Sequence, residues 1–271
     1  MPFSWAPMWH FRQPLQLKQV MLCGGIMAYL ACSLPIWALA TSPPNQDESV
    51  SRGKALYEKA CLLCHGKTGK GNGPDAFYLG AYSAPRPRDF TEAEFKFRST
   101  SSGELPSDED IFTTITKGIP GFMPAFQGLS EADRWDIVRY VKSFSTLYQE
   151  AERTPIILPP GPLPATTKSV SRGREVYALL DCAKCHRPQT LQPGGLYDMG
   201  ELRDRRDLKI LPPDLSSPSS FKNGHRPQDI AQSILTGLDG TPMASFRETL
   251  SAQPEDLWHL VNYLLSLSRS P

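Results

Sequence analysis

The chain has 271 residues, 26 of them proline, and a formal net charge of +1 at pH 7. This length with so much proline fits two small domains and connecting segments better than one large core. A nucleic-acid-binding protein would carry a basic stripe with interleaved aromatic residues, and the balanced charge argues against such a partner.

Residues 1–40 have the pattern of an export signal. Arg12 and Lys18 are their only charged residues, and an uncharged run over 20–40 ends in the small-x-small sequence Ala38-Leu39-Ala40. We therefore expect a cleaved secretory signal peptide and a periplasmic protein. About 20 apolar residues can also span a bilayer, so an uncleaved membrane anchor is the alternative. Contact with a membrane is expected only if residues 1–40 are retained.

Two copies of the pattern C-x-x-C-H follow. They are Cys61-Leu62-Leu63-Cys64-His65 and Cys182-Ala183-Lys184-Cys185-His186. In c-type attachment the two thiols bond the vinyl groups of a haem, and the histidine ligates its iron. A redox dithiol or half of a zinc site would also show C-x-x-C, but Cys61 and Cys182 lie 121 positions apart, against about 12–20 between the pairs of a four-cysteine zinc site. The sequence predicts two covalently bound haem c groups.

The surroundings of the two motifs are also repeated. Val50-Ser51-Arg52-Gly53 reappears as Val170-Ser171-Arg172-Gly173, 120 positions later. Val138-Arg139-Tyr140 matches Val261-Asn262-Tyr263 at an offset of 123, which implies two extra residues at the start of the second closing helix. The chain is therefore an internal duplication.

Each half has the same predicted order of elements. A helix that carries the haem motif begins, in the first half, near Ser51 as N-cap. A long loop, a short helix (about 107–117 and 227–236), a methionine loop and an amphipathic closing helix follow, the first closing helix capped at Ser130. The predicted fold class is all-α.

A proline-rich segment separates the halves and is expected to be extended and semi-rigid. The predicted organisation is a signal peptide or anchor over 1–40, a first domain over 41–153, a linker over 154–168 and a second domain over 169–271.

Met123 and Met243 are the candidates for the sixth iron ligand. They lie in Gly/Pro loops and follow His65 and His186 by 58 and 57 positions. Methionine is most often core filler, but outside residues 1–40 the chain has only three, and two of them occupy matching positions. The third, Met199, has no counterpart and is expected to pack in a loop.

Two histidines are alternative candidates for the sixth ligand of the second iron, and three arginines are candidates for binding the haem propionates. His225, in a loop, or His259, on the expected solvent side of the closing helix, would have to displace Met243 to give a second haem with two histidine ligands. Three arginines could pair with haem propionates: Arg86, Arg88 and Arg98.

The pattern as a whole resembles a duplicated class I cytochrome c over Val50–Tyr148 and Val170–Leu267, with an organisation similar to the dihaem cytochromes c4. The resemblance implies His65 and His186 as proximal ligands and Met123 and Met243 as distal ligands. The run Phe95–Thr100 with Gly103–Pro106 looks like periplasmic cytochromes that accompany respiratory oxidoreductases, which implies redox proteins as partners.

These features predict an electron carrier, because an iron with two protein ligands has no position for substrate. One alternative is a dihaem enzyme with one open or labile haem, as in peroxidases or thiosulfate dehydrogenases. Another is an electron-transfer subunit tethered within a larger respiratory complex.

Overall fold

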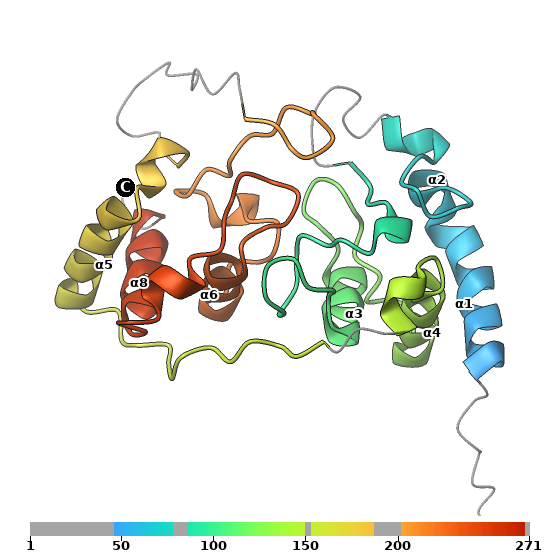
Figure 1. Ribbon diagram of the computed structural model, residues 1–271, viewed down its shortest axis with the longest axis horizontal. Helices are drawn as coiled ribbons and strands as arrows, with labels where there is room; N and C mark the ends of the chain where they lie inside the picture. Colours follow the sequence, from blue (N-terminus) through green and yellow to red (C-terminus); the bar gives the residue numbers. More distant parts are fainter. Residues whose placement is uncertain (1–45, 78–85, 150–152, 187–201, 269–271) are drawn as a thin grey trace, which may run out of the picture. The chain divides into compact units, whose positions relative to one another are not determined.

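The computed structural model describes residues 46–77, 86–149, 153–186 and 202–268, which form helices and short 3-10 turns without a β-strand (Figure 1). This confirms the predicted all-α class. No helix within these ranges is long and apolar enough to cross a membrane. Residues 1–40 and Met199 lie outside the described residues, so the signal peptide stays a prediction.

The two halves repeat one order of helices. The first half contains α1 (Gln46–Ala60), α2 (Leu62–His65), α3 (Asp108–Lys117) and α4 (Glu131–Lys142). The second half contains α5 (Thr167–Leu179), a 3-10 turn (Cys182–Lys184), α6 (Pro227–Thr236), α7 (Arg247–Leu250) and α8 (Asp256–Leu267).

The ends of α3 and α6 are set by capping residues and by glycine. Ser107 and Asp110 form a capping box at the start of α3, and Pro227 occupies the first turn of α6. Both helices end at a glycine with φ of 68°, Gly118 and Gly237, a conformation that side chains disfavour. The prediction for both helices is therefore confirmed to within a residue.

The start of the first helix was predicted wrongly, because α1 begins at Gln46 and Ser51 lies inside it. Asp47 and Glu48 occupy the first turn, where negative charge is favourable. Ser49 is buried and bonds Asp136 on α4, so tertiary contact extends the helix beyond its apolar pattern.

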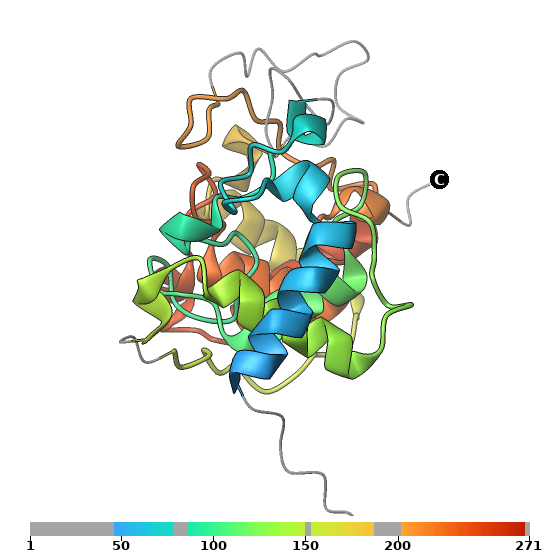
Figure 2. The ribbon, with the colours of Figure 1, turned by 90° about the vertical axis from the view of Figure 1, so that its right-hand side faces the viewer.

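In each half the haem-motif helix lies against the closing helix, α1 against α4 and α5 against α8 (Figure 2). A glycine permits each close approach, since Gly53 faces the backbone of Asp136 and Gly173 faces that of His259. Asp136 and His259 are 123 positions apart, the offset expected from two extra residues in the second half.

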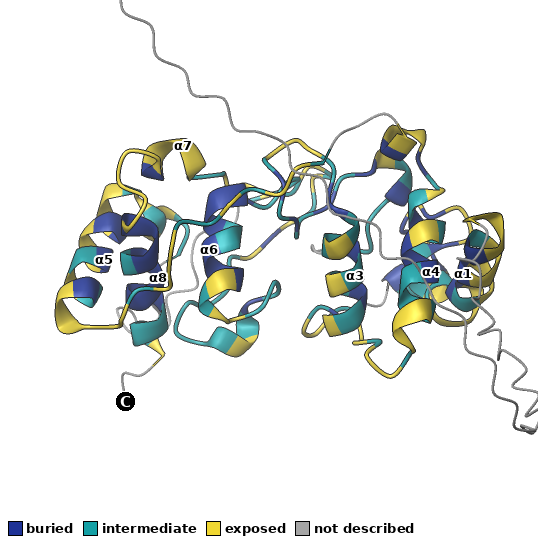
Figure 3. Ribbon diagram, turned by 90° about the horizontal axis from the view of Figure 1, so that it is seen from below, coloured by how far each residue is buried: buried dark blue, intermediate teal, exposed yellow. Residues whose placement is uncertain are grey.

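His259 and Asn262 do not lie on the solvent side of α8. Ser169 Oγ and His259 Nδ1 are 2.8 Å apart, and Asn262 is 7% exposed and donates to Ser169 Oγ and the Leu163 carbonyl. The expectation that His259 lies on the solvent side was wrong, because α8 packs against both α5 and α6 and is buried along most of its length (Figure 3).

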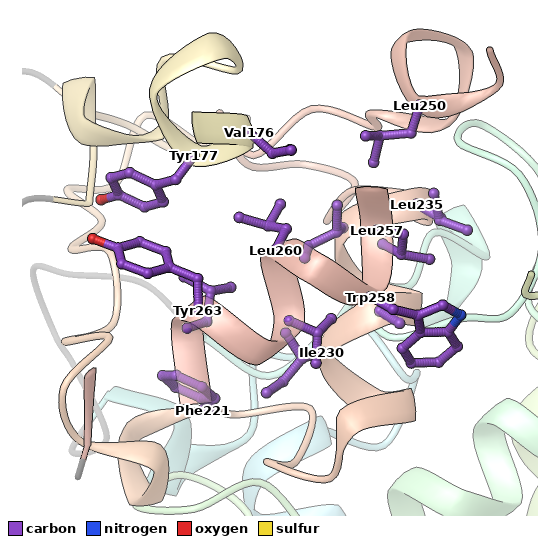
Figure 4. Close-up of a cluster of buried hydrophobic side chains, with 14 residues drawn as sticks. Val176, Tyr177, Phe221, Ile230, Leu235, Leu250, Leu257, Trp258, Leu260 and Tyr263 are labelled. Atoms are coloured by element: carbon purple, nitrogen blue, oxygen red, sulfur yellow. The ribbon is translucent and has the colours of Figure 1, made fainter. Parts of the chain in front are cut away.

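Each half has its own hydrophobic core. Figure 4 shows the second, in which Tyr177 and Tyr263 meet edge to face at 5.4 Å between ring centroids. Trp258 is 1% exposed and donates from its indole nitrogen to the Pro159 carbonyl of the proline-rich segment, 3.1 Å away. The amide of Ile156 donates to Ser99 O in the first half, so this segment is bonded to both halves.

Asp136 gives a first testable prediction. Burial alone would raise its pKa, but hydrogen bonds from Arg52 and Ser49 outweigh burial and hold the pKa below its ordinary value. A carboxylate with a lowered folded-state pKa contributes stability at neutral pH that is lost as pH falls through that pKa. Asp136→Asn should cost about 1–3 kcal/mol of unfolding free energy at pH 7 and progressively less below about pH 4.

Urea denaturation at several pH values measures this effect. Glu58→Gln, exposed on α1, is the matched control and should leave the pH profile unchanged. If Asp136→Asn and the wild type differed by the same unfolding free energy from pH 7 to pH 3, the lowered pKa of Asp136 would be contradicted.

Candidate haem sites

The first C-x-x-C-H motif lines an apolar cavity of about 170 Å³. Cys61 is the residue before α2, and Cys64 and His65 lie on this short helix, which follows directly from α1. Met123, from the loop after α3, lines the same cavity. The structure thus brings together all four site residues predicted in the first half.

The second motif lines a cavity of about 270 Å³ in the same way. Cys182 begins a 3-10 turn after α5, with Cys185 and His186 next to it, and Met243 comes from the loop after α6. All four predicted residues of the second half are again present in one lining.

Both histidines lie in surroundings that suit a metal-bound neutral imidazole. Burial lowers the pKa of His65 to about 4, with the backbone of Arg88 acting weakly in the opposite direction. Burial also lowers the pKa of His186, opposed by the backbone of Pro213. The Nδ1 atom of each ring is buried and has no hydrogen-bond partner of good geometry, and burial favours the uncharged ring at neutral pH.

Three of the four motif cysteines lie where burial disfavours the thiolate. Burial raises the pKa of Cys61 and of Cys182 to about 11, and it raises that of Cys64. A reactive redox dithiol needs a lowered thiol pKa, whereas burial raises the pKa of these three cysteines, which argues against that alternative. Thiols, imidazole and thioether around an apolar cavity fit a haem group held by its edge and its iron.

The two methionine loops are closed by the same backbone bonds. Met123 O accepts from the amide of Ile119, at 2.8 Å, and Met243 O accepts from that of Leu238, at 2.9 Å. Each partner directly follows the helix-ending glycine, Gly118 or Gly237. The methionine is therefore held at a fixed distance from the end of the short helix in both halves.

The alternative ligands lie elsewhere. His225 is exposed and His259 bonds Ser169, and neither lines the second cavity. The position of Met243 in the lining favours it over both histidines.

Among the candidate propionate partners, Arg86 and Arg88 line the first cavity. Arg98 does not. It is fully buried, and its Nη2 donates to Asp239 Oδ1 and to the Thr236 carbonyl, at 2.9 and 2.7 Å. It therefore serves to join the two halves.

Asp239 was missed by sequence reasoning, although it lies in the loop that leads to Met243. Its carboxylate accepts from Arg98, Ser102 Oγ and the amide of Gly103, and these three come from the first half. The loop that presents Met243 is thus fixed by the other half of the chain. A long-range ion pair leaves no local pattern in a sequence, so no signal could have found it.

Comparison with known families agrees with the geometry. The family model for cytochrome c oxidase, cbb3-type, subunit III matches residues 48–141, and the cytochrome c family model matches residues 170–268. A chain of the reducing HAO-like protein complex of Kuenenia stuttgartiensis is 36% identical with a TM-score of 0.71, and the match covers 80% of this chain and 95% of that chain. A search of curated proteins gave no match. The chain therefore belongs to the c-type cytochromes, with two haem-binding class I electron-transfer domains in tandem.

Proposed function

We propose that the protein is a periplasmic dihaem cytochrome that carries single electrons between respiratory redox partners through two covalently attached haem c groups, each with histidine and methionine ligands. The observation that carries the proposal is the presence of two cysteines, one histidine and one methionine in the lining of each apolar cavity. When bound, each haem supplies an iron that is oxidised and reduced by one electron.

The residues of the chain fix how such a group is held. His65 and His186 are kept neutral by burial and so offer a lone pair at neutral pH. Met123 and Met243 offer a soft thioether, which favours ferrous iron and a higher potential than two histidines. Two protein ligands leave no open position, which supports an electron carrier over an enzyme.

The similar solved chain belongs to a protein complex, and this favours a second, related candidate. In it the protein works as an electron-transfer subunit bound to a larger redox enzyme rather than as a diffusing carrier. Co-purification of the untagged chain with a second redox protein at physiological ionic strength would favour the subunit, whereas elution of the chain alone would favour the carrier.

Optical and magnetic spectra of the exported protein, with a potentiometric titration, test the function. We expect two haems per chain, both low-spin with the weak red absorption of methionine-ligated ferric haem, and no binding of carbon monoxide to the reduced protein. Rapid binding of carbon monoxide at one haem would contradict the carrier and favour an enzyme with an open site.

Covalent attachment gives a separate prediction. Replacement of both Cys182 and Cys185 by serine should leave one haem on the denatured polypeptide where the wild type keeps two, because haem c stays on the chain only through thioether bonds. Haem-stained denaturing gels and mass spectrometry measure the loss. The matched variant with Cys61 and Cys64 replaced should also retain one haem. Retention of two haems by either variant would be inconsistent with the assignment.

A further inference from the structure

Three residues line both cavities, and two of them are lysines. Lys96 and Phe97 come from the loop before α3 in the first half, and Lys222 comes from the segment before α6 in the second. The two cavities thus share a wall that carries two ammonium groups.

Neither ammonium has an anionic partner within the described ranges. Asp204 attracts Lys96 more weakly than Arg88 and Lys222 repel it, and the ammonium of Lys222 lies 4.6 Å from the ring centroid of Phe122. Burial lowers the pKa of Lys96 to about 7 and also lowers that of Lys222. Half-buried cations of this kind are costly unless an anion joins them.

The residues of the two linings supply no such anion. Asp181 is the one acid among the described residues that line either cavity, and its exposed carboxylate is paired with Lys184. In contrast, two neighbouring arginines have acidic partners: Arg88 pairs with Glu94 and Arg98 with Asp239. Among the described residues no lining side chain supplies the missing negative charge, whereas a carboxylate on the group that fills each cavity would supply it.

We propose that Lys96 and Lys222 form one shared cationic site that binds a carboxylate of the haem in each half. This inference rests on the proposed function, since the carboxylates are the propionates of the two haems. It gives the lysines a role that neither domain could provide alone, because one ammonium comes from each half. The charge at this wall then acts on both irons together.

The consequence is measurable as a potential. Oxidised iron carries one more positive charge than reduced iron, so a nearby cation favours the reduced state. Loss of one ammonium should change the oxidised-to-reduced ratio of both haems by about tenfold at a fixed potential, a fall of 59 mV for a one-electron couple. Lys96→Met and Lys222→Met should each lower both midpoints, although each alters only one half of the sequence.

The experiment is a potentiometric titration of the full-length holoprotein and its variants. Lys96→Arg and Lys222→Arg keep the charge and should stay near the wild-type midpoints. Lys54→Met, exposed on α1 and outside both linings, is the matched control and should shift neither midpoint. The two methionine variants lie in different halves, so either one alone is decisive if the other does not assemble.

Haem content and the red absorption of methionine ligation are recorded on the same samples. A chain without two methionine-ligated haems would contradict the proposed function itself. Two intact haems with a shift at one haem only, or at neither, would overturn the shared site and leave the proposed function standing.

Discussion

Met123→Leu and Met243→Leu should each remove the sixth iron ligand from one haem and leave the other haem unchanged. Leucine fills a similar volume but cannot ligate iron, so the fold should be retained while the sixth position becomes available. The potential of the altered haem should fall by on the order of 120 mV or more, a hundredfold change in its oxidised-to-reduced ratio. The red absorption should drop by half, and carbon monoxide should bind one haem per chain.

The two variants serve as controls for each other, because each keeps one unchanged methionine loop. A double variant should lose the red absorption completely and bind carbon monoxide at both haems. If Met243→Leu kept the wild-type spectrum, another residue would have to ligate that iron. A subsequent His225→Ala or His259→Ala substitution would then identify which one.

Gly53→Ala and Gly173→Ala should destabilise their own halves strongly. A Cβ at Gly53 would lie less than 3.0 Å from the carbonyl of Asp136, and one at Gly173 equally close to that of His259. Both contacts are with helix backbone, which cannot turn aside as a flexible side chain can. We expect a loss of about 2–3 kcal/mol of unfolding free energy, despite the better helix propensity of alanine.

Gly128→Ala is the matched control, because nothing lies within 4 Å of an added Cβ there. Its effect should stay within about 1 kcal/mol and could be stabilising. Guanidinium denaturation followed by circular dichroism measures loss of the helices, and the Soret band measures loss of the haem surroundings in both halves together. Wild-type stability in both glycine variants would show that α1 and α4, and α5 and α8, do not approach as closely as described.

The sequence predicted those parts of the fold that depend on local patterns. The paired C-x-x-C-H motifs, the bounds of α3 and α6 and the cap of α4 at Ser130 are all readable from short stretches of sequence. The start of α1 was missed because Ser49 is held by Asp136, which lies 87 positions later. Tertiary contact there overrides the apolar period that marks a helix.

The haem sites also combine residues that a local sequence pattern predicts with residues that only tertiary contacts bring into place. The eight site residues were predicted from motif and spacing, and the structure places four of them in the lining of each cavity. Asp239, Lys96 and Lys222 could not be found in this way. An aspartate in a glycine loop and two isolated lysines look like ordinary surface residues in a sequence. Only folding brings Asp239 to Arg98 and places both lysines in the wall between the cavities.

Each methionine loop is contacted by a cation from the opposite half. Arg98 of the first half bonds Asp239 beside Met243, and Lys222 of the second half lies over the ring of Phe122 beside Met123. A half produced alone would lack the group that steadies its own ligand loop, and a substitution in one half would appear as a defect in the other. After duplication each copy therefore supplies a contact to the ligand loop of the other.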